Sequence, residues 1–255
     1  MGFWMFSLKK DHNWEEGKEE EGKENVLIFG CSFSAGSYGI REKGSTVFYL
    51  DELISGSRGW YHYVDHFKDK NVIVKACTGQ GYWSWYQILL KLNDLDKLKQ
   101  YNEIWIQETI EPRPTFISDN YFRVEVIDGI KIFQKDVSDC LMLSHKSYSK
   151  NEIDDRFIND QFTKRLSKFI IKDFEDICHE NDIKGFVWSI DNFSYTHTWF
   201  KRLFLAQKRS VYNQLMQNNL LAVQNEISHQ TEEGNKYIGN LINTELKKWD
   251  EYEVS

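Results

Sequence analysis

The chain of 255 residues is 41% hydrophobic and 15% aromatic, enough to bury a core without a disulfide or a metal, which excludes wholesale disorder. Its formal net charge of −7 argues against nonspecific binding to DNA or anionic lipid, so we expect no nucleic-acid or membrane partner. No stretch approaches 18 uninterrupted apolar residues and the N-terminus lacks the charge order of a signal peptide, so we expect a cytoplasmic protein.

Residues 1–24 form an N-terminal segment whose second part, from residue 9, is a charged, low-complexity run. Few of its side chains can contribute to a core, and we interpret 1–24 as a solvated, disorder-prone tail. The folded domain is predicted to begin at Asn25 and to extend to residue 255.

Short apolar runs, each typical of a buried parallel strand, recur through this domain. They are Val26–Phe29, Val72–Val74, Ile104–Ile106 and Phe186–Trp188. Between and after them, apolar residues recur with helical spacing, most clearly over 162–177 and 237–246. Alternating strands and helices predict a mostly parallel sheet covered on both faces, which is a three-layer α/β/α sandwich.

One segment breaks this alternation. Residues 122–133 alternate with a period of two around Asp128-Gly129, a strong indication of a β-hairpin. We therefore predict an inserted hairpin within about 118–150, near the ligand-binding edge of the sheet.

A run of small residues, 30–36, directly follows the first predicted strand and contains Cys31 and Ser32. Open α/β sheets bind ligands at the carboxyl ends of their strands, where backbone N–H groups can stabilise an oxyanion beside a nucleophilic serine. Taken alone, the run also fits an ordinary turn or a phosphate cradle, although it lacks the spacing of known nucleotide-binding loops. We expect Cys31 to pack as a small buried thiol. The four cysteines form no C-x-x-C pair, so we predict free thiols, no metal site and no cofactor.

His229 lies shortly before the last predicted helix. Thr231 can cap that helix, with Glu232 and Glu233 in its first turn. This places His229 in a loop just before the helix, where a histidine is either solvent-exposed or catalytic.

Together the two segments resemble the SGNH (GDSL-type) hydrolase family, which opens with Gly-Asp-Ser-x-Ser after its first strand and closes with Asp-x-x-His before its last helix. Gly59-Trp60 and Ala76–Gly79 resemble further blocks of the family, so the resemblance spans 25–255. It implies a flavodoxin-like SGNH fold and a serine esterase with a catalytic triad. In that triad Ser32 is the nucleophile, His229 the base and Glu226 the acid, and the amides of Ser32 and Gly79 form the oxyanion hole.

The chain departs from the family pattern at three places. Cys31 stands where the family has Asp, Glu226 replaces the triad Asp, and the asparagine of the third block is absent. Gln107 or Thr109 is a candidate for the missing oxyanion donor. The arrangement that ends at Arg113 is similar to that of divergent SGNH-like proteins carried by tailed phages.

Three residues are candidates for substrate binding. Arg113 can anchor an anionic group, Asp191 follows the fourth predicted strand, and Trp83 belongs to an aromatic set at 82–86 that could provide a platform. Core packing or a loop role is the alternative for each. His62, His66, His179 and His197 lack the spacing of metal ligands.

The resemblance implies an esterase that removes a small acyl group, such as acetyl, from a carbohydrate or another polar molecule. The expected partner is thus a small-molecule or glycan ester, and the oligomeric state stays open. The departures favour an alternative, a catalytically inactive SGNH-fold binding or structural protein. A nucleotide-binding module is a third reading.

Overall fold

The computed structural model describes residues 22–31, 33–34, 58–76, 81–108, 115–116, 122–127, 130–135, 141–142, 160–191, 196–205, 209–224 and 227–253. The strands are β1 (Asn25–Gly30), β2 (Asn71–Ala76), β3 (Glu103–Glu108), β4 (Thr115–Phe116), β5 (Phe122–Ile127), β6 (Ile130–Lys135), β7 (Leu141–Met142), β8 (Lys184–Ser189), β9 (Lys201–Leu203), β10 (Leu221–Gln224) and β11 (Ile227–Gln230). The α-helices are α1 (Tyr82–Asp94), α2 (Asp160–Glu180), α3 (Val211–Gln217) and α4 (Glu232–Glu253). Short 3₁₀ turns are η1 (Trp60–Tyr63), η2 (Asp65–Phe67) and η3 (Leu98–Gln100). Residues 1–21 of the predicted tail lie outside the described ranges.

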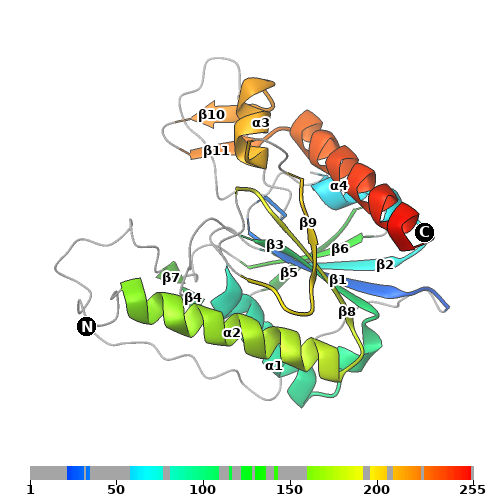
Figure 1. Cartoon of the computed structure of the whole chain (residues 1–255), viewed down its shortest axis with the longest axis vertical. Helices are drawn as coiled ribbons and strands as arrows, with labels where there is room; N and C mark the ends of the chain where they lie inside the picture. Colours follow the sequence, from blue (N-terminus) through cyan, green and yellow to red (C-terminus); the bar gives the residue numbers. More distant parts are fainter. Residues whose placement is uncertain are drawn as a thin grey trace.

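The central sheet has seven strands in the order β5-β6-β2-β1-β3-β8-β9 (Figure 1). Neighbouring strands are parallel throughout, except for the antiparallel pair β5 and β6. The strands predicted from the apolar runs, β1, β2, β3 and β8, lie side by side in the middle of the sheet. Almost all of their residues are buried, as expected for strands covered on both faces.

β5 and β6 form the predicted hairpin, with Ile127 opposite Ile130. The turn residues Asp128 and Gly129 lie outside the described residues. β6 also pairs in parallel with β2, so the hairpin extends the central sheet. β4 pairs antiparallel with β7, with Thr115 opposite Met142, and thereby brings the two ends of the insertion together.

Helices cover both faces of the sheet, with α1 and α2 on one side and α4 on the other (Figure 1). Alternate residues of β1 supply the two cores, because successive side chains of a strand point to opposite faces. Leu27 and Phe29 join the core beneath α1 and α2, whereas Val26 and Ile28 join the core beneath α4. The predicted three-layer α/β/α sandwich with an inserted hairpin is confirmed. Within the described ranges, no helix combines the length and apolar character needed to span a bilayer.

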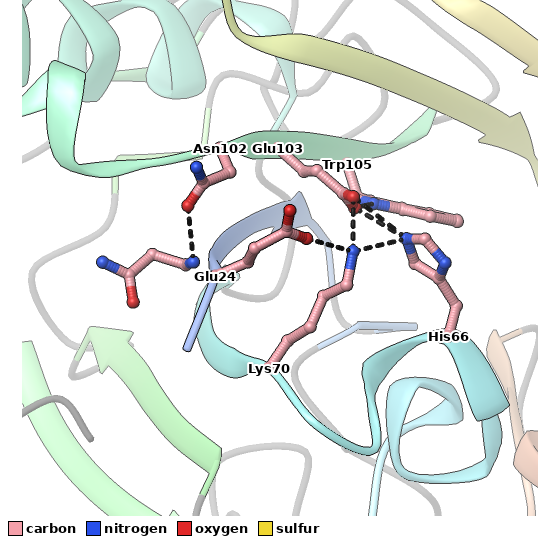
Figure 2. Close-up of polar contacts among 7 residues, drawn as sticks. Glu24, His66, Lys70, Asn102, Glu103 and Trp105 are labelled. Atoms are coloured by element: carbon pink, nitrogen blue, oxygen red, sulfur yellow. Dashed lines mark hydrogen bonds and ion pairs between the residues drawn. The ribbon is translucent and has the colours of Figure 1, made fainter. Parts of the chain in front are cut away.

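A polar network closes the amino-terminal edge of the sheet (Figure 2). Glu103, at the start of β3, accepts hydrogen bonds from Trp105 Nε1 at 2.9 Å and from the Lys70 ammonium, and His66 Nε2 lies 2.8 Å from its Oε2. Lys70 also forms an ion pair with the exposed Glu24 at 2.9 Å. Burial of Glu103 would raise the pKa of its carboxyl, but the hydrogen bonds from His66, Lys70 and Trp105 outweigh burial and lower the pKa to about 2.

This network predicts acid sensitivity that a single substitution should remove. The pKa of Glu103 is depressed in the folded state, so its stabilisation is complete above about pH 4.5 and is lost as pH falls toward 2. The free energy of unfolding, measured in urea, should fall between pH 7 and pH 3 by about 2 kcal/mol less for Glu103→Gln than for the wild type. Glu24→Gln removes a carboxylate from the same lysine at an exposed position, so its acid profile should follow the wild type. Parallel profiles for Glu103→Gln and the wild type would contradict this account.

Candidate active site

The loop after β1 turns back tightly on the strand. The backbone N–H of Ser34 donates to the carbonyl oxygen of Cys31 at 2.8 Å. A Cβ atom on Gly30 would lie 2.2 Å from Ser34 Oγ, so only glycine fits at this close approach. Ser34 is fully buried and its Oγ accepts a hydrogen bond from Trp60 Nε1 at 2.9 Å. Ser32 lies outside the described residues, but both of its chain neighbours, Cys31 and Phe33, are described.

Gln107 holds this loop from the end of β3. Its Oε1 accepts from the backbone N–H of Cys31 at 3.2 Å, from Cys31 Sγ at 3.1 Å and from Ser34 Oγ at 3.4 Å. Its Nε2 donates to the carbonyl oxygen of Glu108 at 3.0 Å. The side chain predicted as an oxyanion donor is therefore engaged in bracing the loop, and its oxyanion role stays a prediction. Cys31 is buried with a free thiol, as predicted.

His229 lies on β11, in an antiparallel hairpin in which it pairs with Ala222 of β10 (Figure 1). Its predicted place in a loop is wrong. Each strand of this hairpin has only four residues and lies apart from the central sheet, so neither shows a run long enough to indicate a strand. The predicted cap of α4 is confirmed, because Thr231 Oγ1 accepts from the N–H of Gly234 at 3.1 Å.

The histidine hairpin meets the loop after β1. The ring of His229, 4% exposed, stacks on the ring of Phe33 with centroids 5.6 Å apart and planes inclined by 29°. Gln230 Nε2 donates to the backbone carbonyl oxygen of Phe33 at 2.7 Å across 197 positions of sequence. These contacts bring His229 to the chain neighbour of Ser32, at the carboxyl end of β1.

The other predicted site residues are placed less completely. Glu226, Gly79, Thr109 and Arg113 lie outside the described residues. Trp83 lies on α1, and its Nε1 donates to Ser167 Oγ of α2 at 3.3 Å. Asp191 follows β8 at the carboxyl edge of the sheet, partly buried, and its backbone N–H donates to Ser189 Oγ at 3.4 Å. Substrate binding by Trp83, Asp191 or Arg113 stays a prediction.

A second polar cluster lies at the same edge, beneath α1 and α2. His197 is held between two buried carboxylates: its Nδ1 contacts Glu175 Oε1, and its Nε2 lies 3.4 Å from Glu108 Oε1. Tyr82 OH lies 3.4 Å from the same Nε2. The other oxygen of Glu175 accepts from the N–H groups of Thr198 and Trp199 at 2.7 and 2.9 Å. Spacing did not reveal this cluster, because its residues come from four segments that are distant in sequence.

The electrostatics of this cluster favour a charged imidazole. Burial alone would lower the pKa of His197, but the hydrogen bonds and the negative charges of Glu108 and Glu175 outweigh burial and raise it. A proton on this buried ring lies between two carboxylates that would otherwise repel each other. The cluster therefore fastens β3, α2 and the segment after β8 to one another.

No protein-family model and no curated protein matches the sequence. Solved structures that are similar to it include the following three. A Bacteroides fragilis protein provisionally described as an acylhydrolase is 11% identical, with a TM-score of 0.41 over 92% of this chain and 91% of its own. The Bacillus subtilis protein YxiM is 10% identical, with a TM-score of 0.46 over 89% of this chain and 57% of its own. A GDSL-like lipase from Bacteroides thetaiotaomicron is 13% identical, with a TM-score of 0.35 over 88% of each chain. The candidate site therefore rests on the contacts between the histidine hairpin and the loop after β1.

Proposed function

We propose that this chain is a serine hydrolase of the SGNH (GDSL-type) class, in which Ser32 attacks an ester carbonyl and His229 is the general base. The observation that carries the proposal is the contact of His229 with Phe33, which follows Ser32 directly. The site lies at the carboxyl end of β1, where parallel sheets bind ligands. Two segments that lie near opposite ends of the sequence meet there, as a nucleophile and its base must.

The proposed reaction is acyl transfer through a covalent intermediate. His229 takes the proton of Ser32 Oγ as that oxygen bonds to the ester carbon, and the carbonyl electrons move onto the oxygen. The amides of Ser32 and Gly79 stabilise this oxyanion, and Glu226 orients the imidazole. The C–O bond to the alcohol then breaks, and His229 returns the proton to the departing oxygen. Water repeats the sequence on the acyl-enzyme and releases the acid.

The proposed substrate carries a small acyl group, such as acetyl, on a carbohydrate or another polar molecule. His229 is nearly buried against Phe33, and so enclosed a base suits a short acyl chain better than a long one. Arg113, Trp83 and Asp191 are the proposed contacts to the rest of the substrate. The net charge of −7 and the free thiols of the described cysteines fit a cytoplasmic protein without nucleic acid or membrane partners.

Labelling with a fluorophosphonate tests the proposal, together with turnover of p-nitrophenyl acetate and p-nitrophenyl decanoate. The wild type should be labelled at Ser32, as read from the modified peptide, and should hydrolyse the acetate faster than the decanoate. Ser32→Ala should lose labelling and turnover while keeping its melting temperature. Labelling of another serine would refute the assignment of the nucleophile.

The alternative is a binding or structural protein of the same fold without turnover. The position of Gln107 favours it, because the amide nitrogen of this side chain donates to the carbonyl oxygen of Glu108 and its oxygen accepts from the backbone N–H of Cys31 in the loop after β1. A folded wild type that neither takes the label nor hydrolyses either ester would support this alternative.

A further inference from the structure

We infer that Gln230 is a positioning residue, which sets the place of His229 relative to Ser32 by joining the histidine hairpin to the loop after β1. The inference rests on the proposed function. Gln230 is the last residue of β11 and is fully buried. Its Nε2 donates to two oxygens, the backbone carbonyl of Phe33 at 2.7 Å and Asn235 Oδ1 at 3.0 Å.

The orientation of both amides is dictated by backbone carbonyls, which can only accept hydrogen bonds. Asn235 Nδ2 donates to the carbonyl oxygen of Arg58 at 3.0 Å, so Asn235 Oδ1 faces Gln230. That oxygen and the carbonyl of Phe33 both need a donor, which must be Gln230 Nε2. The hydrogen bonds of these two amides therefore each have one direction. They join three segments: residue 58 before η1, the first turn of α4, and the loop that carries Ser32.

The side-chain oxygen of Gln230 indicates a role for this residue other than stabilising the fold. Within the described part of the chain, Gln230 Oε1 is buried and has no hydrogen-bond partner. Buried polar atoms without a partner are rare and destabilising. Among the described residues, the side-chain bonds of Gln230 are therefore made by its donor, and that donor reaches the residue next to the proposed nucleophile.

The expected consequence is an effect on the chemical step. Proton transfer from Ser32 to His229 needs the two side chains within hydrogen-bond reach, and a misplacement of about 1 Å can cost about a hundredfold in rate. Among the described residues, the side chain of Gln230 bonds to Phe33 and Asn235, neither of which is a proposed substrate contact, so its loss should lower kcat and leave KM nearly unchanged.

Two variants remove the donor in different ways. Gln230→Glu keeps the shape and turns a carboxylate oxygen toward two carbonyl oxygens, and Gln230→Met keeps the length without adding charge. Gln214→Glu is the matched control, because Gln214 Nε2 also donates to two backbone carbonyls, those of Leu205 and Arg209, at 3.3 and 3.0 Å. The control removes the same kind of bond between α3 and the residues before it, where the partners are Leu205 and Arg209.

The rates of fluorophosphonate labelling and of p-nitrophenyl acetate hydrolysis are measured for each variant, alone and combined with His229→Ala. Gln230→Glu and Gln230→Met should lower labelling and kcat by about ten- to a hundredfold with KM within about twofold, while Gln214→Glu stays within about twofold of the wild type. In the His229→Ala background the Gln230 substitutions should have no further effect, because there is then no base to misplace.

Normal labelling of both Gln230 variants would overturn the inference and leave the proposed function standing. A loss that persists undiminished in the His229→Ala background would also overturn it, since Gln230 would then act on the fold alone. Absence of labelling in a folded wild type would instead overturn the proposed function, and the inference with it. Should Gln230→Glu fail to fold, Gln230→Met decides by the same criteria.

Discussion

Replacing Glu175 with glutamine is expected to lower the free energy of unfolding by about 3–5 kcal/mol, because it breaks a buried ion pair and leaves His197 with only the more distant carboxylate of Glu108. Glu175 holds His197 through one oxygen and the N–H groups of Thr198 and Trp199 through the other. A glutamine can present only one oxygen, and its NH₂ group would face donors in place of acceptors. Unfolding in urea, followed by tryptophan fluorescence, measures the loss.

The neighbouring residue of α2 provides the control. Asp176 forms an ion pair with Lys172 and accepts from Trp199 Nε1 at 3.1 Å, so it contacts the same segment from a partly exposed position. Asp176→Asn is therefore expected to change the free energy of unfolding little. Equal losses of unfolding free energy in Glu175→Gln and Asp176→Asn would show that the buried His197 cluster contributes no more to stability than the ion pair of Asp176 does.

The same cluster sets the sign of a pH dependence at the alkaline end. The pKa of His197 is raised in the folded state, so the stabilisation is complete below about pH 6.5 and is lost as pH rises through the folded pKa. Glu108, Glu175 and the phenol of Tyr82 are titratable groups that contact the ring in the described structure. Glu175→Gln should therefore flatten the stability profile above pH 6.5. This sign is opposite to that of Glu103, whose contribution disappears in acid.

The central part of the fold could be predicted from sequence because its signals are local. A strand covered on both faces reads as an apolar run, which is how Val26–Phe29 and Ile104–Ile106 were recognised. The hairpin of β5 and β6 carried both a period of two and an Asp-Gly turn. The hairpin of β10 and β11 carried neither, and its extended backbone depends on the pairing of Ala222 with His229.

The residues of the candidate site also divide into those with a local sequence signal and those without one. Ser32 and His229 could be singled out because each belongs to a short motif, and the contact between His229 and Phe33 fits their pairing. Gln230 and the His197 cluster could not, because their roles arise from bonds that span 197 and 89 positions. A single sequence without aligned relatives gives no indication of which distant polar residues will meet.

Replacing His229 with alanine is expected to lower kcat/KM for p-nitrophenyl acetate by about 10²- to 10⁴-fold, the usual contribution of a general base. The fold should persist, because β11 pairs with β10 through its backbone and Gln230 still bonds to Phe33. The substitution removes the ring that stacks on Phe33 and leaves a space of imidazole size beside Phe33, the chain neighbour of the proposed nucleophile.

That space makes the role of His229 testable apart from its contribution to stability. Imidazole added at millimolar concentration should restore part of the turnover of His229→Ala, since a free base can occupy the space and take the Ser32 proton. Imidazole should restore nothing to Ser32→Ala, which has no proton to give. His179→Ala is the matched control, because His179 is an exposed histidine of α2 that stacks on Trp199, and its turnover should equal that of the wild type. Full activity in His229→Ala would assign the base to another residue, whereas loss without rescue in a protein of unchanged melting temperature would mean that the imidazole must be held in place to act.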